Sequence, residues 1–228
     1  MALRCDAVIF DLDGVLVDSN AISERQMRVW AERHGVAFAR IAAIHHGRPT
    51  IETMRLVAPH LDVEAEARLV EAAEADDTDG LRLFAGAARL VGGLPEARWA
   101  IVTSGTRRLA TTRLDYVGLR RPAVLVTADD VRRGKPAPDP YLLAAERLGV
   151  EARRCVVVED APAGVASGRA AGARVIGVAS TMAPVALGQA DLVVARLEDL
   201  AIAVGSATLR ITWRAAIRQG DAAMYTGP

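Results

Sequence analysis

Five short apolar runs, rich in β-branched residues, occur between residues 99 and 194 of this 228-residue chain. They are Trp99–Val102, Ala123–Val126, Cys155–Val158, Val175–Val178 and Leu192–Val194. No charged residue interrupts them, which is typical of strands buried on both faces of a parallel sheet. Segments with helical length and spacing separate the runs: Arg107–Tyr116, Asp139–Leu148 and Ala163–Ala171. Strands that alternate with helices predict an α/β fold in which a Rossmann-like parallel sheet forms the core.

Residues 18–82 differ, because helical periodicity continues there without β-like alternation. The apolar positions with this spacing are Met27, Trp30, Ala31, Ile51, Met54, Ala58, Val63, Ala67 and Val70. The charged residues expected on the solvated side are Glu64, Glu66, Arg68, Glu71 and Glu74. An earlier apolar run, Ala7–Phe10, needs the later strands as its partners. We therefore predict a discontinuous α/β core of residues 1–17 and 83–228, with an inserted α-helical cap domain of residues 18–82.

Two further segments border these regions. Asp76–Gly80 is a polar break, which predicts a linker after the helices. Beyond Ser206, Leu209, Ile211 and Trp213 alternate with other residues, which predicts an edge strand.

The composition limits the class of protein. Lysine plus arginine and aspartate plus glutamate both total 28, so no net charge favours nucleic acid or an anionic membrane as a partner. No apolar run is long enough for a signal peptide core or a membrane span. Cys5 and Cys155 stand at the start of apolar runs and are expected to be small buried hydrophobes. We therefore expect a cytoplasmic protein that is a monomer, with a dimer as the alternative.

Polar residues follow several predicted strands at their carboxyl ends, where ligands bind in open α/β sheets. The first strand ends in Asp11-Leu12-Asp13. Its two carboxylates repel each other unless a cation, a shared proton or hydrogen bonds compensate. Thr103 and Ser104 follow the second strand along the chain and lead into a helix. Hydroxyls and free amides at a helix N-terminus predict an anion-binding site there.

Two more carboxylates, Glu159 and Asp160, follow a later strand. Crowded carboxylates of this kind indicate a divalent cation, and oxygen ligands suit Mg²⁺. Lys135 is the only lysine of the chain and lies in a stiff, proline-rich loop. Arginine supplies every other positively charged residue counted with it, so Lys135 is a candidate for a role that needs a compact ammonium and not a planar guanidinium. Carboxylates, an anion cradle, a lysine and Mg²⁺ together fit phosphoryl transfer, in which an aspartate can act as nucleophile.

Four stretches, taken together, resemble the haloacid dehalogenase-like superfamily, specifically its phosphatases with a helical cap. They are Asp11-Leu12-Asp13-Gly14-Val15-Leu16-Val17-Asp18-Ser19, Val102-Thr103-Ser104-Gly105, Gly134-Lys135-Pro136 and Glu159-Asp160-Ala161-Pro162-Ala163-Gly164. Their order and spacing make the joint signal specific, and the likeness covers residues 5–200. Within the superfamily the chain is similar to sugar-phosphate and polyol-phosphate phosphatases, such as those that act on 2-deoxyglucose 6-phosphate or glycerol phosphate. The resemblance implies a small phosphorylated metabolite as the substrate.

The resemblance also implies a role for each matching residue in the reaction. Asp11 would be the nucleophile that forms an aspartyl-phosphate. Asp13 would protonate the leaving alcohol and then activate water against the aspartyl-phosphate. Ser104, with Thr103 and the adjacent amides, would bind phosphate oxygens, and Lys135 would bridge the phosphate and the nucleophile.

A metal site is implied by the same likeness. Mg²⁺ would be held by the side chain of Asp11, the main-chain carbonyl of Asp13 and the side chain of Asp160. Glu159 would lie next to these ligands and hold them in place without binding Mg²⁺ itself.

Substrate choice would lie in the cap, because the core contacts only the phosphate. A short polar segment there, His45-His46-Gly47-Arg48, is flanked by helical segments. We expect Arg48 to hold a hydroxyl-rich or anionic group, with His46 and Gly47 beside it. Asn20, just beyond the first motif, is a further candidate for substrate contact.

Two alternatives remain open. Mutases of the β-phosphoglucomutase type share nearly all the core motifs, but their cap carries a lysine-glycine segment followed by Ser-Arg. Here His46-Gly47-Arg48-Pro49-Thr50 departs from that pattern. The remote alternative is a non-catalytic phosphoryl-accepting module. Receiver domains of that class are about half as long and have no inserted cap.

Overall fold

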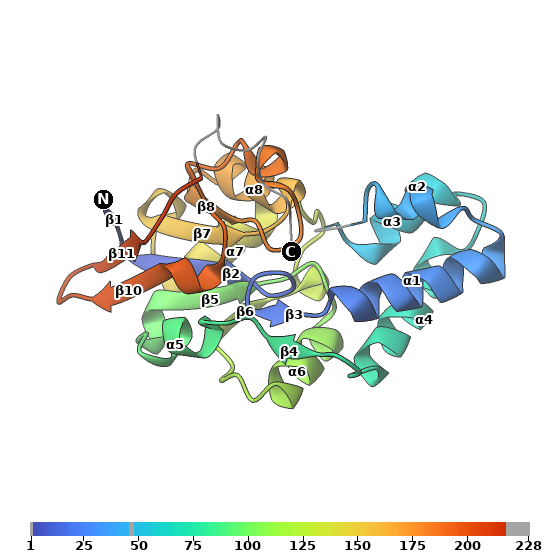
Figure 1. Ribbon diagram of the computed structural model, residues 1–228, viewed down its shortest axis with the longest axis horizontal. Coiled ribbons are helices and arrows are strands. Elements are labelled where there is room, and N and C mark those ends of the chain that lie inside the picture. Colours follow the sequence, from blue (N-terminus) through green and yellow to red (C-terminus); the bar gives the residue numbers. More distant parts are fainter. Residues whose placement is uncertain (1, 46–47, 218–228) are drawn as a thin grey trace.

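A parallel sheet of six strands lies at the centre of residues 2–45 and 48–217, which the computed structural model describes (Figure 1). The strand order is β6-β5-β2-β7-β8-β9, and every neighbouring pair is parallel. The strands are β2 (Ala7–Asp11), β5 (Trp99–Val102), β6 (Val124–Val126), β7 (Cys155–Glu159), β8 (Arg174–Val178) and β9 (Leu192–Val194). The α/β fold predicted from the alternating runs is therefore confirmed. The first strand in the chain to join this sheet, β2, is central and lies between β5 and β7.

Helices cover both faces of this sheet. Alternate residues of β2 enter two different hydrophobic clusters, Val8 and Phe10 on one face and Ala7 and Ile9 on the other. The first cluster includes residues of α5 (Ala87–Gly92) and α6 (Arg107–Tyr116). The second includes residues of α7 (Asp139–Leu148) and α8 (Pro162–Ala170). Burial on both faces explains why no charged residue stands between the first residue and the carboxyl end of any of these six strands.

Helix boundaries in this half follow local signals. Pro162 stands in the first turn of α8, where its missing N–H costs no helical hydrogen bond. Gly149 caps the C-terminus of α7; it has a φ of +69° and donates its N–H to the carbonyls of the last turn. The ranges predicted for α6 and α7 agree with the structure, and α8 begins and ends one residue earlier than predicted.

Four helices follow β3 (Val17–Asp18) and lie to one side of the sheet (Figure 1). They are α1 (Asn20–His34), α2 (Phe38–Ala42), α3 (Thr50–Val57) and α4 (Val63–Asp76). These helices bury a hydrophobic cluster of their own, built around Met27, Trp30 and Met54. Strand β3 then pairs antiparallel with β4 (Arg82–Leu83), so the segments that enter and leave the helical block lie side by side. The domain boundaries at residues 17/18 and 82/83 stay a prediction.

One side chain of this block was misassigned. Glu74 of α4 was expected on the solvated side, but it is only 4% exposed. It continues the buried stripe of Ala67 and Val70, where α4 packs against α6. The prediction was wrong because the surface that covers Glu74 belongs to a helix more than thirty residues later in the chain.

A second, three-stranded sheet contains β1 (Ala2–Cys5), β10 (Leu200–Val204) and β11 (Leu209–Trp213). Strand β11 pairs antiparallel with both β1 and β10. The prediction of an edge strand was therefore wrong. Alternation within residues 209–213 shows one buried face, with Leu209 and Ile211 inside, but it does not show how many partners the strand has.

Short 3₁₀ turns connect the remaining elements: Glu96–Arg98, Ala128–Asp130, Ala152–Arg154, Pro184–Leu187 and Leu197–Asp199. Among the described residues, no helix has the length and apolar character needed to cross a membrane. Cys5 and Cys155 are both buried and free, as expected from their positions.

Candidate active site

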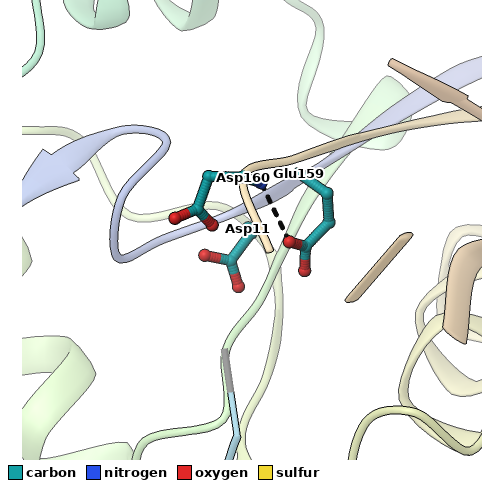
Figure 2. Close-up of side chains that lie close together, drawn as sticks. All are labelled: Asp11, Glu159 and Asp160. Carbon is teal, nitrogen blue, oxygen red and sulfur yellow. Dashed lines mark hydrogen bonds between the residues drawn. The ribbon is translucent and has the colours of Figure 1, made fainter. Parts of the chain in front are cut away.

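Three acidic side chains meet at the carboxyl ends of the central strands. Asp11 is the last residue of β2, Glu159 is the last residue of β7, and Asp160 follows it directly. Since β2 and β7 are parallel neighbours, their ends bring these residues together. One carboxylate oxygen from each lies within 4.8 Å of the others, and all three residues are buried. Figure 2 shows the three side chains at this junction, with the main-chain N–H of Asp160 bonded to Glu159.

Lys135 inserts its ammonium into this acidic cluster. The residue is 1% exposed, and its Nζ donates to Asp11 Oδ1 and, at 2.6 Å, to Glu159 Oε1. Burial by itself would lower the pKa of Lys135, but Asp11 and Glu159 raise that pKa well above its usual value. Lys135 is therefore a fixed cation inside the protein, joined directly to Asp11.

Glu159 is occupied by hydrogen bonds on both oxygens. Lys135 and the Tyr141 hydroxyl donate to Oε1, the latter at 2.8 Å. The main-chain N–H groups of Asp160 and Ala161 donate to Oε2 at 3.0 and 3.1 Å. Two donors on each oxygen use the lone pairs of a carboxylate. Glu159 therefore fits a supporting role beside the other carboxylates better than a role as a direct cation ligand.

Asp11 and Asp160 have the character of a cation site. Burial raises the pKa of Asp11 well above its usual value, Glu159 and Asp160 raise it further, and Lys135 opposes the rise. Burial and the neighbouring Glu159 likewise raise the pKa of Asp160 to about 8. Such shifts mean that the ionised pair is unfavourable as it stands, and a bound divalent cation would stabilise both carboxylates. The residues present therefore fit an oxygen-ligated cation such as Mg²⁺.

Asp13 lies two residues beyond Asp11 and is held by three donors. Its Oδ1 accepts from the Ser19 hydroxyl at 2.8 Å and from Arg113 Nη1 at 2.6 Å. Its Oδ2 accepts from the Thr103 hydroxyl at 3.2 Å. The side chain of Asp13 keeps 27% of its surface exposed, so it stays open to a molecule in the site.

The turn after Asp13 depends on glycine. Gly14 has a φ of +87°, a conformation that side chains with a Cβ rarely adopt. A Cβ there would lie 2.1 Å from Asp160 Oδ2. The sharp turn therefore allows the chain to leave the sheet toward the helical block without displacing Asp160.

Sequence reasoning missed an ion pair beside Asp13. Arg113 of α6 also donates from Nη2 to Glu74 Oε2 at 2.7 Å, and both side chains are about 5% exposed or less. Ser23 of α1 donates to Glu74 Oε1 at 3.1 Å and shares a 2.7 Å hydrogen bond with His45 Nε2. The available signal was a charged residue on an apolar helix face, since Arg113 lies one turn after the buried Leu109.

A pocket lies between the sheet edge and the helical block. Five residues of the acidic and hydroxyl clusters line it: Asp11, Asp13, Thr103, Ser104 and Asp160. From residues 18–82 it is lined by Ser19, Asn20, Ser23, His45, Arg48, Thr50 and Glu74. Gly105, Leu109 and Arg113 complete the lining. Among the predicted substrate contacts, Asn20 and Arg48 therefore reach the pocket, whereas His46 and Gly47 lie outside the described residues.

Lys135 and Glu159 do not line this pocket within the described part of the chain. Both side chains are buried, and Lys135 links Glu159 to Asp11, which does line the pocket. The structure thus brings all seven predicted core residues to one sheet edge: five line the pocket, and Lys135 and Glu159 are buried beside it.

The contact between α4 and α6 should depend on pH through Glu71. Burial raises the pKa of Glu71 to about 7, and Glu74 and Asp129 add to the rise, while Thr106 and Arg113 oppose it. The folded state holds the proton of Glu71 more tightly than the unfolded chain does. The stability that this proton contributes is therefore lost as the pH rises from 4.5, the ordinary pKa, through about 7, the pKa in the folded state. Glu71→Gln should therefore raise the free energy of unfolding by roughly 1–2 kcal/mol more at pH 8 than at pH 5, discounted for partial exposure.

Urea unfolding at the two pH values measures this difference. Glu64→Gln on the same helix is the control, because Arg55 lowers the pKa of Glu64 and its removal should not stabilise the protein at pH 8. An equal effect of Glu71→Gln at both pH values would show that the proton on Glu71 is not bound more tightly after folding.

Comparisons with known proteins identify the family of this chain. The family model described as haloacid dehalogenase-like hydrolase matches residues 5–172, which contain all the carboxylates discussed above. Hexitol phosphatase A of Escherichia coli is 44% identical over 205 residues, covering 88% of this chain and 95% of that protein. Glycerol-1-phosphate phosphohydrolase 2 of Saccharomyces cerevisiae is 34% identical over 194 residues, covering 79% of this chain and 77% of that protein.

A solved structure supports the same assignment at the level of the fold. The crystal structure of a hydrolase from Pseudomonas syringae superposes with a TM-score of 0.76 at 27% identity, covering 85% of this chain and 95% of that one. The resemblance inferred from the four motifs is therefore confirmed by both kinds of relative. The chain belongs to the haloacid dehalogenase-like hydrolase family.

Proposed function

We propose that this protein is a Mg²⁺-dependent phosphatase that hydrolyses small sugar or polyol phosphate monoesters through an aspartyl-phosphate intermediate. The observation that carries the proposal is the environment of Asp11. One of its oxygens is bound by the buried Lys135, while Asp13 lies beside it in the same pocket. The names of the two relatives above, a hexitol phosphatase and a glycerol-1-phosphate phosphohydrolase, support the substrate class.

Asp11 acts as the nucleophile in this proposal. Lys135 holds Oδ1, so Oδ2 is the oxygen available to attack the phosphorus atom. The new bond joins Asp11 Oδ2 to phosphorus, and the ester bond between phosphorus and the substrate oxygen breaks. Ser104, with Thr103 and the adjacent amides at the start of α6, binds phosphate oxygens, and the charge of Lys135 stabilises the negative charge that gathers there.

Asp13 moves the proton in both half-reactions. Within the described residues, Oδ1 accepts two hydrogen bonds and Oδ2 accepts only the longer one from Thr103. Oδ2 is therefore the atom that carries the proton to the leaving oxygen, which departs as an alcohol. The ionised Asp13 next takes a proton from water, whose oxygen attacks phosphorus. The bond to Asp11 then breaks, and inorganic phosphate leaves.

The cation would be held by the side chains of Asp11 and Asp160 and by the main-chain carbonyl of Asp13, with Glu159 in support. When bound, Mg²⁺ supplies positive charge that offsets the mutual repulsion of the nucleophile and the phosphate. Lys135 by itself leaves the cluster of Asp11, Glu159 and Asp160 with excess negative charge. That imbalance supports the assignment of a divalent cation.

The helical block of residues 18–82 acts as a cap that selects the substrate. Asn20, His46, Gly47 and Arg48 are its proposed substrate contacts. The pocket wall from this block consists of polar side chains, which suits the hydroxyl groups of a sugar or polyol. We further infer a cytoplasmic location, because the two buried, free cysteines suit a reducing compartment. A monomer remains the expected oligomeric state, with a dimer as the alternative.

A steady-state assay with Mg²⁺ tests the function. Hexitol phosphates, glycerol phosphate and 2-deoxyglucose 6-phosphate should release inorganic phosphate, and removal of divalent cations with EDTA should stop the release. A phosphate group that moves within the sugar without release would instead establish the mutase. That alternative is less supported, because both relatives carry the names of phosphatases. Absence of turnover with every ester would favour the phosphoryl-accepting module.

A further inference from the structure

We propose that Arg113 is a positioning residue that orients the carboxylate of Asp13 for proton transfer only while Glu74 of the helical block is docked against it. This inference rests on the proposed function, because it takes Asp13 as the acid. It adds a residue that belongs to none of the four motifs. It also makes the orientation of the acid depend on the contact between α4 and α6.

The guanidinium of Arg113 links the proposed acid to the helical block. The guanidinium uses its two terminal nitrogens on two different carboxylates, Nη1 on Asp13 and Nη2 on Glu74. Asp13 belongs to the loop after β2, whereas Glu74 lies on α4. Because the guanidinium is planar and rigid, a displacement of either carboxylate tilts the whole group. The position of Glu74 therefore determines where Nη1 lies relative to Asp13.

Burial makes this arrangement sensitive to its partners. The side chains of Arg113 and Glu74 are 5% and 4% exposed. Arg113 Nε is buried and has no hydrogen-bond partner among the described residues, so the two carboxylates are the groups that fix the guanidinium. A buried charge that loses one partner is not compensated by water. Arg113 should therefore lose its orientation when α4 moves away from α6.

A second ion pair joins the same two helices and provides a control. It helps to hold α4 against α6 but does not contact Asp13, so its removal tests helix packing alone. Arg108 of α6 bonds Asp76 of α4 at 2.7 Å, but both side chains are more than 60% exposed. Helices α4 and α6 lie next to each other (Figure 1). The pairs Arg108–Asp76 and Arg113–Glu74 both join these two helices. Only the Arg113 pair reaches Asp13 within the described structure. Arg108 is therefore the matched control for a purely structural role.

The leaving group of the substrate reveals whether the acid is positioned. An alkyl phosphate releases a poor leaving group that needs a proton, whereas p-nitrophenyl phosphate releases a stable phenolate that does not. The ratio kcat/KM contains the steps up to departure of the leaving group and excludes the later attack of water. A misplaced Asp13 should therefore lower kcat/KM for the alkyl ester and largely spare the aryl ester.

The experiment compares both esters in purified full-length variants with Mg²⁺. We expect Arg113→Met to lower kcat/KM for glycerol phosphate or a hexitol phosphate about 100-fold, the scale of general acid catalysis, and for p-nitrophenyl phosphate less than about 10-fold. Glu74→Gln should also lower kcat/KM for the alkyl ester more than kcat/KM for p-nitrophenyl phosphate, but both decreases should be smaller than those of Arg113→Met. Arg108→Met should leave both within about 2-fold.

Equal losses for both esters would overturn the proposal, because a structural role lowers both alike. If Arg113→Met does not fold, the double variant Arg113→Met/Glu74→Gln removes both buried charges and should show the same split between esters. Asp13→Asn distinguishes the two levels of inference. If it shows no split while wild type still releases phosphate, Asp13 is not the acid, and the proposed mechanism fails together with the positioning role; if wild type releases no phosphate from any ester, the proposed function itself fails. If Asp13→Asn shows the split and the Arg113 variants do not, only the positioning role fails.

Discussion

Replacing Asp11 with asparagine is expected to abolish the turnover of phosphate esters, with kcat falling by at least about 10⁴-fold. The amide keeps the size of the side chain and an oxygen for Lys135, but it is too weak a nucleophile to attack phosphorus. Radiolabelled substrate followed by acid quenching should trap a phosphorylated protein with wild type and none with Asp11→Asn. The same variant should still bind phosphate, because the hydroxyls of Thr103 and Ser104 are unchanged.

The fold should survive this substitution. Burial and neighbouring carboxylates raise the pKa of Asp11, which means that its ionised form is costly in the metal-free protein. Asparagine removes that cost, and Glu159 still pairs with Lys135. We therefore expect the urea midpoint of metal-free Asp11→Asn not to fall below that of wild type. A large drop would mean that loss of activity reports unfolding.

Asp6→Asn is the matched control for Asp11→Asn. Asp6 directly precedes β2, at the opposite end of the strand, and its carboxylate bonds Arg154 on the surface. Its removal takes away one carboxylate without touching the pocket, so kcat should stay within about 2-fold. Retention of turnover by Asp11→Asn, or a labelled residue other than Asp11 in wild type, would contradict the assigned nucleophile.

The residues at the carboxyl edge of the sheet could be predicted from the amino-acid sequence, and the reason is physical. Apolar strand runs must be buried, and parallel strands deliver their carboxyl ends to one edge. Residues that follow such runs, such as Asp11, Ser104 and Asp160, can therefore be grouped from their positions along the chain alone. Lys135 could be added because its residue type occurs once in the chain.

Contacts between helices were not predictable in the same way. The bond from Arg113 to Glu74 joins two helices whose relative placement depends on packing of the entire helical block. A linear pattern shows that each residue interrupts an apolar stripe, but not which partner covers it. The same limit explains the error at β11, whose second partner, β1, lies at the other end of the chain.

Lys135 should contribute strongly to stability as well as to catalysis. Lys135→Met keeps the length of the side chain and removes the ammonium, which leaves Asp11 and Glu159 buried without their shared cation. Loss of one partner from a buried ion pair costs about 3–5 kcal/mol. We expect a decrease of this size in the free energy of unfolding, measured with urea in EDTA, together with a large loss of kcat. Adding Mg²⁺ should restore part of the stability, because the cation offsets the same charges.

The matched control lies two residues away in the same loop. Arg133 pairs with Asp139 on the surface with 71% of its side chain exposed, so Arg133→Met should leave the free energy of unfolding essentially unchanged. The double variant Lys135→Met/Glu159→Gln should be more stable than Lys135→Met, since it removes one of the two uncompensated carboxylates. If the double variant is the less stable one, the bonds that Glu159 accepts from Tyr141 and the main chain outweigh the charge. If Lys135→Met is instead as stable as wild type, Lys135 acts mainly on the reaction, by holding Asp11 Oδ1 and leaving Oδ2 to attack.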